Sequence, residues 1–349
     1  SIQPRRSYTG RFGRSALARA KESSLAPAAY FLYQTFALKS KVETIIKRLQ
    51  PDIVHCIRLP LEGYIGGLIG YRPLALTTWG NDMVYFARKY PLCRWLTRKA
   101  MPKVDLYFAD NLRDKYISEL YGFSPSSLTF ITPVTGGLKL DELPIGHKDP
   151  SIMRAARQKL GISPEAIVIT SVRGFKFYYS DIEPLIRAIP DITSAFSDAL
   201  FILRGDTNLP VYSRLQNLAV KLGVENNIRF TDRLSAEELT DYFTASDIMV
   251  SVTTYDGCPV SMLEGMAYGM VPVMSIHSPI QEWVTHGRNG YLFDPKDPED
   301  ITRVAVSALE NKDSFEVMRQ RNWDLLKERA DFYKNMKTVE EMYRRLGEK

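Results

Sequence analysis

The sequence predicts an α/β protein in which two parallel β-sheets, each covered by helices, form two domains. Short β-branched runs alternate with amphipathic segments along most of the chain, which is typical of parallel sheets with helices on both faces. The predominantly apolar run Ile248–Val252 fits a strand buried on both sides. A polar stretch rich in strand and helix breakers, Leu143–Ser151, separates the elements into two groups, so we place a linker there.

The expected elements follow in chain order. The first half has strand-like runs at Asp52–Arg58, Leu74–Trp79, Asp105–Ala109 and Leu128–Val134. The second half has them at Ala166–Arg173, Ala199–Gly205, Ile228–Arg233, Asp247–Thr254, Val271–Ile276 and Gly290–Phe293. Amphipathic spacing predicts helices at Asp181–Phe196, Val211–Gly223 and Ser235–Ser246, the last opening with a capping box. We divide the chain into an N-terminal domain (1–145), a C-terminal domain (146–330) and a terminal helix (331–349).

Composition narrows the class of protein. The 349 residues are 45% hydrophobic and 25% charged, which excludes a disordered or collagen-like chain. The three cysteines (Cys56, Cys93 and Cys258) have no C-x-x-C spacing, so neither disulfides nor a zinc knuckle are expected. This pattern favours a reducing compartment, and we expect a cytoplasmic protein. The uncharged stretches are too short for a membrane span.

Charge is distributed unevenly. Residues 1–150 contain 22 Lys+Arg and 12 Asp+Glu, a net of +10, whereas the remainder has a net of −4. Cations are densest between Arg5 and Lys21, next to the aromatic stretch Leu25–Leu38. This pattern suits contact with the inner face of an anionic membrane or with a phosphorylated acceptor. It equally fits a solvated basic face beside a buried helix. We expect no nucleic-acid partner, because no RNP, KH or zinc-finger pattern is present.

Polar residues follow several expected strands of the second half. Arg173, Arg233 and Asp256 each come at or just after a strand end. Because parallel strands end at one edge of a sheet, where ligands bind, these side chains should converge. Arg and Lys suit a diphosphate, and carboxylates suit paired sugar hydroxyls.

The segment Asp256–Glu264 has the pattern of an anion site. Gly257 permits a tight turn, and Pro259 is acceptable at a helix start. A helix beginning near Val260 would direct free N–H groups at a ligand. Glu264 lies about one turn into that helix. The alternative is that Asp256 only caps the helix and Glu264 is a surface carboxylate.

The run D-G-C-P-V-S-M-L-E-G-M-A-Y-G-M-V-P-V at Asp256–Val273 resembles the signature of family 4 (group 1) glycosyltransferases, in which two glutamates are separated by seven residues. Leu203–Asp206, Phe230–Leu234 and Pro51–His55 look like further landmarks of the family, in its order, over about residues 40–346. The resemblance implies the GT-B fold, with two Rossmann-like domains facing across a cleft. It also implies metal-independent transfer of a sugar, with retention of anomeric configuration, from a UDP- or GDP-linked donor to a glycan, lipid-linked or small-molecule acceptor.

Site roles carry over from the resemblance by position. Glu264 would hold the nucleotide ribose, and Asp256 would face the donor sugar. Arg173 and Lys176 would neutralise the leaving diphosphate, which makes these two and Asp256 the expected catalytic residues. Further donor-binding residues would be Gly257, Cys258, Pro259, Val260, Ser261, Gly205, Arg233 and Leu234. On the acceptor side, Trp79 stands where the family commonly has His, and Asp82 remains. No cofactor and no metal ion are expected, and no D-x-D motif is present.

The chain departs from the family pattern at three places. Asp256 replaces a glutamate and Trp79 replaces the histidine. The first strand of the N-terminal domain and its glycine-rich loop are not found, so we expect this domain to lack its first strand. We favour its removal from the sequence, and a reduced version of the domain is the alternative. These departures keep a non-catalytic nucleotide-sugar-binding or scaffolding protein as an alternative. An epimerase or phosphorylase of the same fold and a polyanion-binding protein are further alternatives. His55, on an apolar strand, is interpreted as structural.

Overall fold

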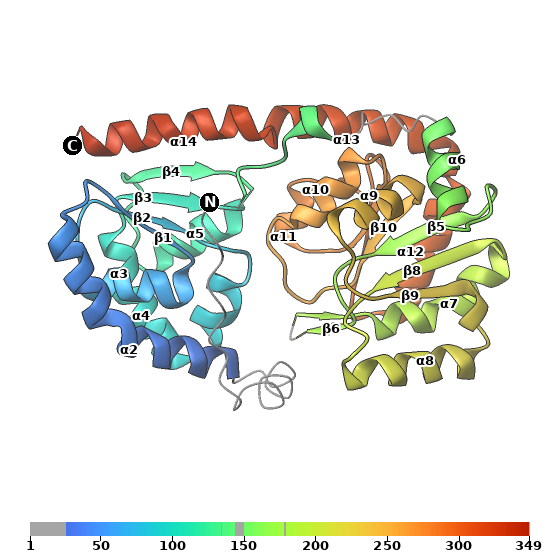
Figure 1. Cartoon of the computed structure of the whole chain (residues 1–349), viewed down its shortest axis with the longest axis horizontal. Coiled ribbons are helices and arrows are strands. Elements are labelled where there is room, and N and C mark those ends of the chain that lie inside the picture. Colours follow the sequence, from blue (N-terminus) through green and yellow to red (C-terminus); the bar gives the residue numbers. More distant parts are fainter. Residues whose placement is uncertain (1–25, 134, 144–149, 178, 349) are drawn as a thin grey trace, which may run out of the picture.

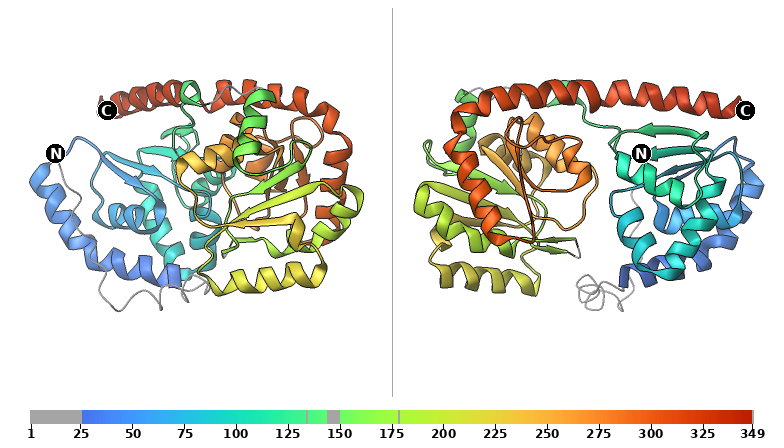
Figure 2. Two further views of the ribbon diagram at one scale, coloured as in Figure 1. Left: turned by 45° about the vertical axis from the view of Figure 1, so that its right-hand side comes forward. Right: turned by 180° about the vertical axis from the view of Figure 1, so that it is seen from behind.

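The structure is a computed structural model that describes residues 26–133, 135–143, 150–177 and 179–348. Two α/β domains lie side by side, and two C-terminal helices run along one side of both (Figure 1). The two further views in Figure 2 show the same arrangement. The predicted two-domain α/β architecture is confirmed. The basic cluster between Arg5 and Lys21 and most of the expected linker lie outside the described residues.

The N-terminal domain contains a four-stranded parallel sheet in the order β1-β2-β3-β4. Its strands are β1 (Val54–Ile57), β2 (Leu74–Thr77), β3 (Leu106–Ala109) and β4 (Leu128–Ile131). Each falls within a run predicted as a strand. Among the described residues β1 pairs only with β2, so it forms an edge of this sheet.

Helices of the N-terminal domain cover one face of this sheet. They are α2 (Ala26–Leu49), α3 (Tyr64–Ile69), α4 (Pro91–Ala100) and α5 (Leu112–Leu120), with helical turns η1 (Leu59–Gly63), η2 (Asp82–Ala87) and η3 (Met101–Lys103). A later turn, η4 (Leu140–Glu142), instead places Leu140 in a core cluster of the C-terminal domain. Strand residues alternate between the two faces. Leu74, Leu76 and Tyr107 join the core beneath α3 and α4, whereas Ala75 and Phe108 face the other way, towards the C-terminal helix.

The C-terminal domain contains a six-stranded parallel sheet in the order β12-β11-β10-β5-β8-β9. Its strands are β5 (Ile167–Ser171), β8 (Ala199–Arg204), β9 (Ile228–Thr231), β10 (Ile248–Ser251), β11 (Val271–Ser275) and β12 (Tyr291–Phe293). All four residues of β10 are buried, as expected for a central strand. A short hairpin follows β5, and the sequence did not predict it. It pairs β6 (Lys176–Phe177) with β7 (Ser180–Asp181), each strand two residues long.

Helices cover both faces of the second sheet. They are α6 (Pro150–Lys159), α7 (Glu183–Ala195), α8 (Pro210–Leu222), α9 (Ala236–Ala245), α10 (Val260–Ala267), α11 (Ser278–Gln281) and α12 (Pro298–Glu310), with turns η5 (Glu225–Asn227) and η6 (Lys312–Ser314). The capping box predicted before α9 is present: Ser235 Oγ accepts from the Glu238 N–H, and the Glu238 carboxylate accepts from the Ser235 N–H.

The tail forms two helices, α13 (Phe315–Arg329) and α14 (Phe332–Gly347). α13 packs on the C-terminal domain, and α14 crosses to the N-terminal domain (Figure 1). There Val339 and Leu346 pack against the open face of the first sheet. Tyr343 OH lies 2.6 Å from Nδ1 of His55, and the other ring nitrogen of His55 lies 2.8 Å from Thr77 Oγ1. His55 therefore joins α14 to the sheet, which agrees with its structural interpretation. None of the described helices is long and apolar enough to cross a membrane.

Candidate functional site

A cavity of about 690 Å³, here called the interdomain cavity, lies between the two domains at the carboxyl edge of the second sheet. Its C-terminal wall is built from residues that follow strands β5, β8, β9 and β10 and from the start of α10. These are Val172, Arg173, Gly174, Tyr179, Arg204, Gly205, Asp206, Leu209, Val211, Arg233, Leu239, Asp256–Ser261 and Glu264. Its N-terminal wall is formed by Arg58, Trp79, Gly80, Asn81, Asp110 and Thr135.

Most residues predicted for the site line this one cavity. They are Arg173, Gly205, Arg233, Asp256, Gly257, Cys258, Pro259, Val260, Ser261, Glu264 and Trp79. Lys176 lies in β6, and its side chain is outside what the structure describes. Leu234 does not line the cavity; Leu239, on α9, occupies the wall instead.

Asp256 is buried and held by two partners from its own domain. Arg173 Nη2 lies 2.5 Å from Asp256 Oδ2, and the N–H of Gly257 donates to Oδ1 at 3.0 Å. Burial raises the pKa of Asp256, and the charge of Arg173 opposes that rise. The Arg173 guanidinium also lies 5.4 Å from the centre of the Tyr179 ring. The first motif carboxylate is thus part of an ion pair rather than a simple helix cap.

The start of α10 reaches the cavity wall. Pro259 precedes the helix in an extended conformation, so the first N–H groups of α10 have no partner within the helix. Glu264 lies one turn further on, and its burial raises the pKa of the carboxyl group. The opposite side of α10 packs into the core, where Met262 and Met266 are almost fully buried. The helix start is therefore fixed firmly beside the cavity, where a negative group would be stabilised.

Arg204 is a cavity residue that sequence reasoning did not select. It is the last residue of β8, adjacent to β5 in the sheet. Its Nη1 donates to the carbonyl of Val172 at 3.3 Å. Its buried Nε has no hydrogen-bond partner among the described residues, and the same is true of Nε of Arg173. Two guanidiniums from neighbouring strand ends thus keep donors available beside the cavity. The sequence did contain a signal for Arg204, because this residue lies directly before Gly205 in the landmark Leu203–Asp206.

Gly205 allows a close approach at the same strand end. A Cβ at this position would lie 2.4 Å from the ring of Phe175. Phe175 is buried, and its ring stacks on Tyr212. Any larger residue would therefore displace this aromatic packing beneath the cavity.

Asp82 has a different role from the one predicted. Its side chain is fully buried and does not line the cavity. It accepts hydrogen bonds from Arg58 Nη2 at 2.7 Å and from the N–H of Trp79 at 3.1 Å. The Arg58 guanidinium lies 5.1 Å from the centre of the Trp79 ring. Asp82 therefore positions two residues of the N-terminal wall. Arg58, which the sequence analysis missed, directly follows β1 and so stands at a carboxyl strand end.

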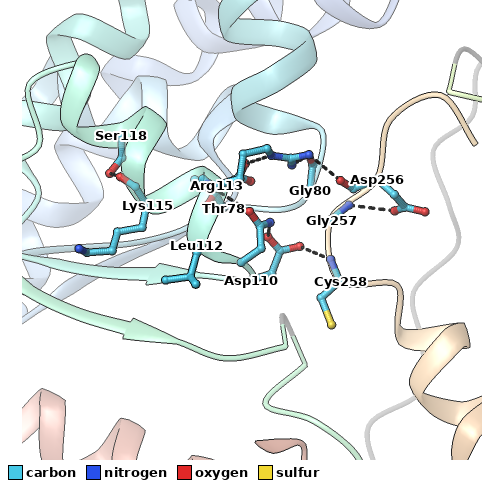
Figure 3. A network of polar contacts seen from close by, with 12 residues as sticks. Thr78, Gly80, Asp110, Leu112, Arg113, Lys115, Ser118, Asp256, Gly257 and Cys258 are labelled. Carbon is cyan, nitrogen blue, oxygen red and sulfur yellow. Dashed lines mark hydrogen bonds and ion pairs between the residues drawn. The ribbon is translucent and has the colours of Figure 1, made fainter. Parts of the chain in front are cut away.

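The two domains touch directly beside the cavity, as Figure 3 shows. The segment Asp256–Cys258 of the C-terminal domain contacts Gly80, Asp110 and Arg113 of the N-terminal domain. We call this the interdomain contact. Arg113 donates to the carbonyls of Asp256 and Gly80, each at 2.8 Å. Asp110 Oδ2 accepts from the N–H of Cys258 at 3.2 Å.

Glycine is required at the centre of this contact. A Cβ on Gly257 would lie 2.2 Å from Asp110 Oδ2, and one on Gly80 would lie 2.3 Å from the Gly257 nitrogen. Burial raises the pKa of Asp110 and holds the pKa of the Cys258 thiol well above its ordinary value. Cys258 is thus a neutral, buried thiol whose backbone N–H makes the polar contact.

The family models match in two segments. The model described as glycosyl transferases group 1 matches residues 153–344, and that described as glycosyl transferase 4-like matches residues 18–112. An N-acetyl-alpha-D-glucosaminyl L-malate synthase of Bacillus anthracis is 22% identical over 295 residues, 82% of this chain and 72% of that protein. An uncharacterized glycosyltransferase of Methanocaldococcus jannaschii is 27% identical over 51% of this chain and 47% of that protein. The chain spans less than half the length of the first curated relatives it matches.

The fold of this chain is similar to that of several solved structures. Anabaena HepE in complex with UDP has a TM-score of 0.75 at 18% identity, covering 89% of this chain and 82% of that one. The sucrose-phosphate synthase of Thermosynechococcus elongatus has a TM-score of 0.75 at 15% identity, covering 89% and 78%. The predicted GT-B fold is confirmed.

Proposed function

We propose that this chain, which belongs to the group 1 glycosyltransferases, transfers a sugar from a nucleotide-sugar donor to an acceptor held against its N-terminal domain. One observation carries the proposal: Arg173 after β5, Arg204 at the end of β8, and Asp256 and Glu264 of the segment after β10 line one cavity. Two cations, two carboxylates and a helix start suit a ligand with a diphosphate between two polyhydroxylated groups.

In the proposed donor complex, Glu264 accepts hydrogen bonds from the ribose hydroxyls. The diphosphate lies at the start of α10, between the guanidiniums of Arg173 and Arg204. As the bond from the sugar to the diphosphate breaks, negative charge grows on the leaving phosphate, and these fixed cations stabilise it. We propose a UDP or GDP donor. A solved relative in fold was crystallised with UDP, and another relative is named for its dependence on GDP-mannose.

We further propose that the reaction retains anomeric configuration and needs neither a metal ion nor another cofactor. The two guanidiniums supply the positive charge that the leaving diphosphate requires. Turnover should be unchanged after treatment with EDTA. A loss that Mg²⁺ or Mn²⁺ restores would instead assign the charge neutralisation to a metal.

The acceptor is proposed to enter along the N-terminal wall, where the Trp79 side chain is partly exposed. An aromatic face of this kind packs well against the C–H groups of a sugar. Closure of the two domains around the donor would exclude water from the reacting centre. We also propose that the N-terminal domain contacts an anionic membrane at its cytoplasmic face, where a lipid-linked acceptor would be found.

A second candidate is a protein that binds a nucleotide sugar without transferring it. Arg173 is already paired with Asp256, and the N–H of Cys258 already bonds to Asp110, so part of the loop is engaged without a donor. Slow hydrolysis of a bound nucleotide sugar would favour the enzyme. Tight binding with no hydrolysis and no transfer to any acceptor would favour the second candidate.

Thermal unfolding with a panel of nucleoside diphosphates tests the proposal. A ligand that binds only the folded state raises the melting temperature, so UDP or GDP should raise that of this protein. Glu264→Ala should abolish the rise. Glu237→Ala, at an exposed carboxylate on α9 outside the cavity, is the matched control and should keep it. No rise with any nucleoside diphosphate would refute donor binding, and an unchanged rise in Glu264→Ala would refute its ribose role.

A further inference from the structure

Helix α4 has an outward face that combines exposed apolar side chains with many cations. Its buried side is formed by Cys93, Leu96, Thr97 and Ala100. On the other side Leu92 is 43% and Trp95 45% exposed. The segment Arg88–Lys99 contains five Lys and Arg residues and no Asp or Glu. The exposed face is therefore both apolar and strongly basic.

Helix α5 continues this surface. Ile117 of α5 and Tyr121, which directly follows α5, pack against the core cluster that holds Cys93 and Leu96 of α4. The Arg98 guanidinium lies 6.0 Å from the centre of the Tyr121 ring, so the two helices are neighbours. On the outside of α5, Tyr116 is 58% and Leu120 81% exposed. The surface consists of the exposed residues Arg88, Lys89, Leu92, Trp95, Arg98 and Lys99 and the half-buried Arg94 of the α4 segment, with exposed Tyr116 and Leu120 of α5. We call it the α4–α5 surface.

Within the part of the chain that the structure describes, the cations of this surface are not neutralised by carboxylates. Among the described residues, no ion pair joins Arg88, Lys89, Arg94, Arg98 or Lys99 to a carboxylate. The Lys99 ammonium lies 5.8 Å from the centre of the Trp95 ring, and Arg94 bonds to the backbone carbonyl of Arg88. The positive charge thus remains available to an anionic partner.

We propose that the α4–α5 surface docks on an anionic lipid bilayer. Trp and Leu side chains partition into the headgroup region, and surrounding Lys and Arg residues are attracted to anionic lipids. This combination distinguishes a bilayer from a nucleic acid, which needs the cations but leaves exposed Leu92 and Leu120 unexplained.

The position of the surface in the fold links it to the proposed reaction. Its Arg88–Lys89 end directly follows η2, in which the Tyr85 ring lies 6.1 Å from the ring of Tyr255 of the other domain. Trp79 of the cavity wall precedes the same turn. Docking here would bring the acceptor side of the cavity close to the bilayer. The inference deepens the membrane contact proposed above, and it does not require that transfer take place.

Flotation with vesicles tests the docking directly. Wild-type protein should float with vesicles of phosphatidylcholine and phosphatidylglycerol but not with phosphatidylcholine alone, and added salt should release it. Each cation near an anionic surface is expected to change partitioning about fivefold. The triple variant Arg94→Glu, Arg98→Glu, Lys99→Glu should therefore lose binding by at least about 100-fold.

The control variant carries the same change of charge elsewhere. Lys221→Glu, Lys296→Glu, Lys312→Glu alters three exposed cations of the C-terminal domain and should float like wild type. Trp95→Phe should also bind, but quenching of tryptophan fluorescence by brominated lipid should largely disappear. In every variant the rise in melting temperature with the nucleoside diphosphate should persist, which separates failure of docking from failure of donor binding.

Three results would overturn the inference. The first is equal flotation of the two triple variants. The second is wild-type binding that ignores lipid charge and salt. The third is retention by heparin or duplex DNA without flotation on anionic vesicles, which would assign the surface to a polyanion.

Discussion

Replacing Arg173 with alanine is expected to destabilise the fold as well as to weaken donor binding. Arg173 is the charged partner of Asp256, whose side chain is only 8% exposed. Removing one partner of a buried ion pair costs about 3–5 kcal/mol because the other charge is left uncompensated. Since 19% of the Arg173 side chain is exposed, water reaches the pair, and we take the lower end, ~3 kcal/mol. This is a large part of the free energy of unfolding of a typical domain, about 5–15 kcal/mol.

The loss should depend on pH. Burial raises the pKa of Asp256, and without Arg173 the pKa rises further. A carboxyl group with a raised pKa in the folded state binds more protons there than in the unfolded chain. The folded protein therefore loses stability as the pH rises from the ordinary carboxyl pKa, about 3.9, through the raised pKa of Asp256. Arg173→Ala should recover part of its stability when the pH is lowered from neutral towards the ordinary carboxyl range.

Denaturant unfolding at neutral and mildly acidic pH measures both effects, with Arg204→Ala as the matched arginine control. Arg204 makes one long hydrogen bond to a backbone carbonyl and no ion pair among the described residues, so its loss should cost within about 1 kcal/mol. Two results would contradict this reasoning. One is that the two variants unfold at the same denaturant concentration at neutral pH. The other is that the difference between their free energies of unfolding does not become smaller at acidic pH.

Three further outcomes are expected. Arg204→Ala should weaken binding of the nucleoside diphosphate roughly 10- to 150-fold, the equivalent of a charged hydrogen bond of about 1.5–3 kcal/mol, and calorimetry would contradict this by an unchanged Kd. Gly257→Ala should separate the domains, because its Cβ would collide with Asp110; small-angle scattering should show a larger radius than for wild type, and an unchanged radius would refute the contact. His55→Ala should loosen α14 by removing the bond to Tyr343, at a cost of about 1–2 kcal/mol; limited proteolysis should cut nearer the C-terminus than in wild type, and equal resistance would contradict the role.

The sequence predicted strands and their carboxyl edge better than it predicted single side chains. β-Branched runs and breakers located β5, β8 and β10. The convergence of Arg173, Arg233 and Asp256 followed from parallel topology, and Glu264 was placed by its spacing within the helix that follows. Arg204 was missed because a run such as L-R-G-D does not say which side chain at a strand end reaches the cavity. Asp82 was assigned to the acceptor side because the sequence does not show that its side chain is buried. The carboxylate pairs with Arg58, 24 residues away in sequence, and such a pairing is visible only in three dimensions.

The shorter carboxylate at position 256 fits the way this loop is held. Both oxygens of Asp256 are engaged within its own domain, by Arg173 and by the N–H of Gly257, while its backbone carbonyl accepts from Arg113 of the other domain. The side chain therefore shapes the loop and orients a guanidinium, and the main chain joins the domains. The interdomain contact and the proposed diphosphate site use the same short segment. A movement of the N-terminal domain at this contact would therefore change the geometry of the diphosphate site. The proposed domain closure would consequently be coupled to the positioning of Arg173 through Asp256.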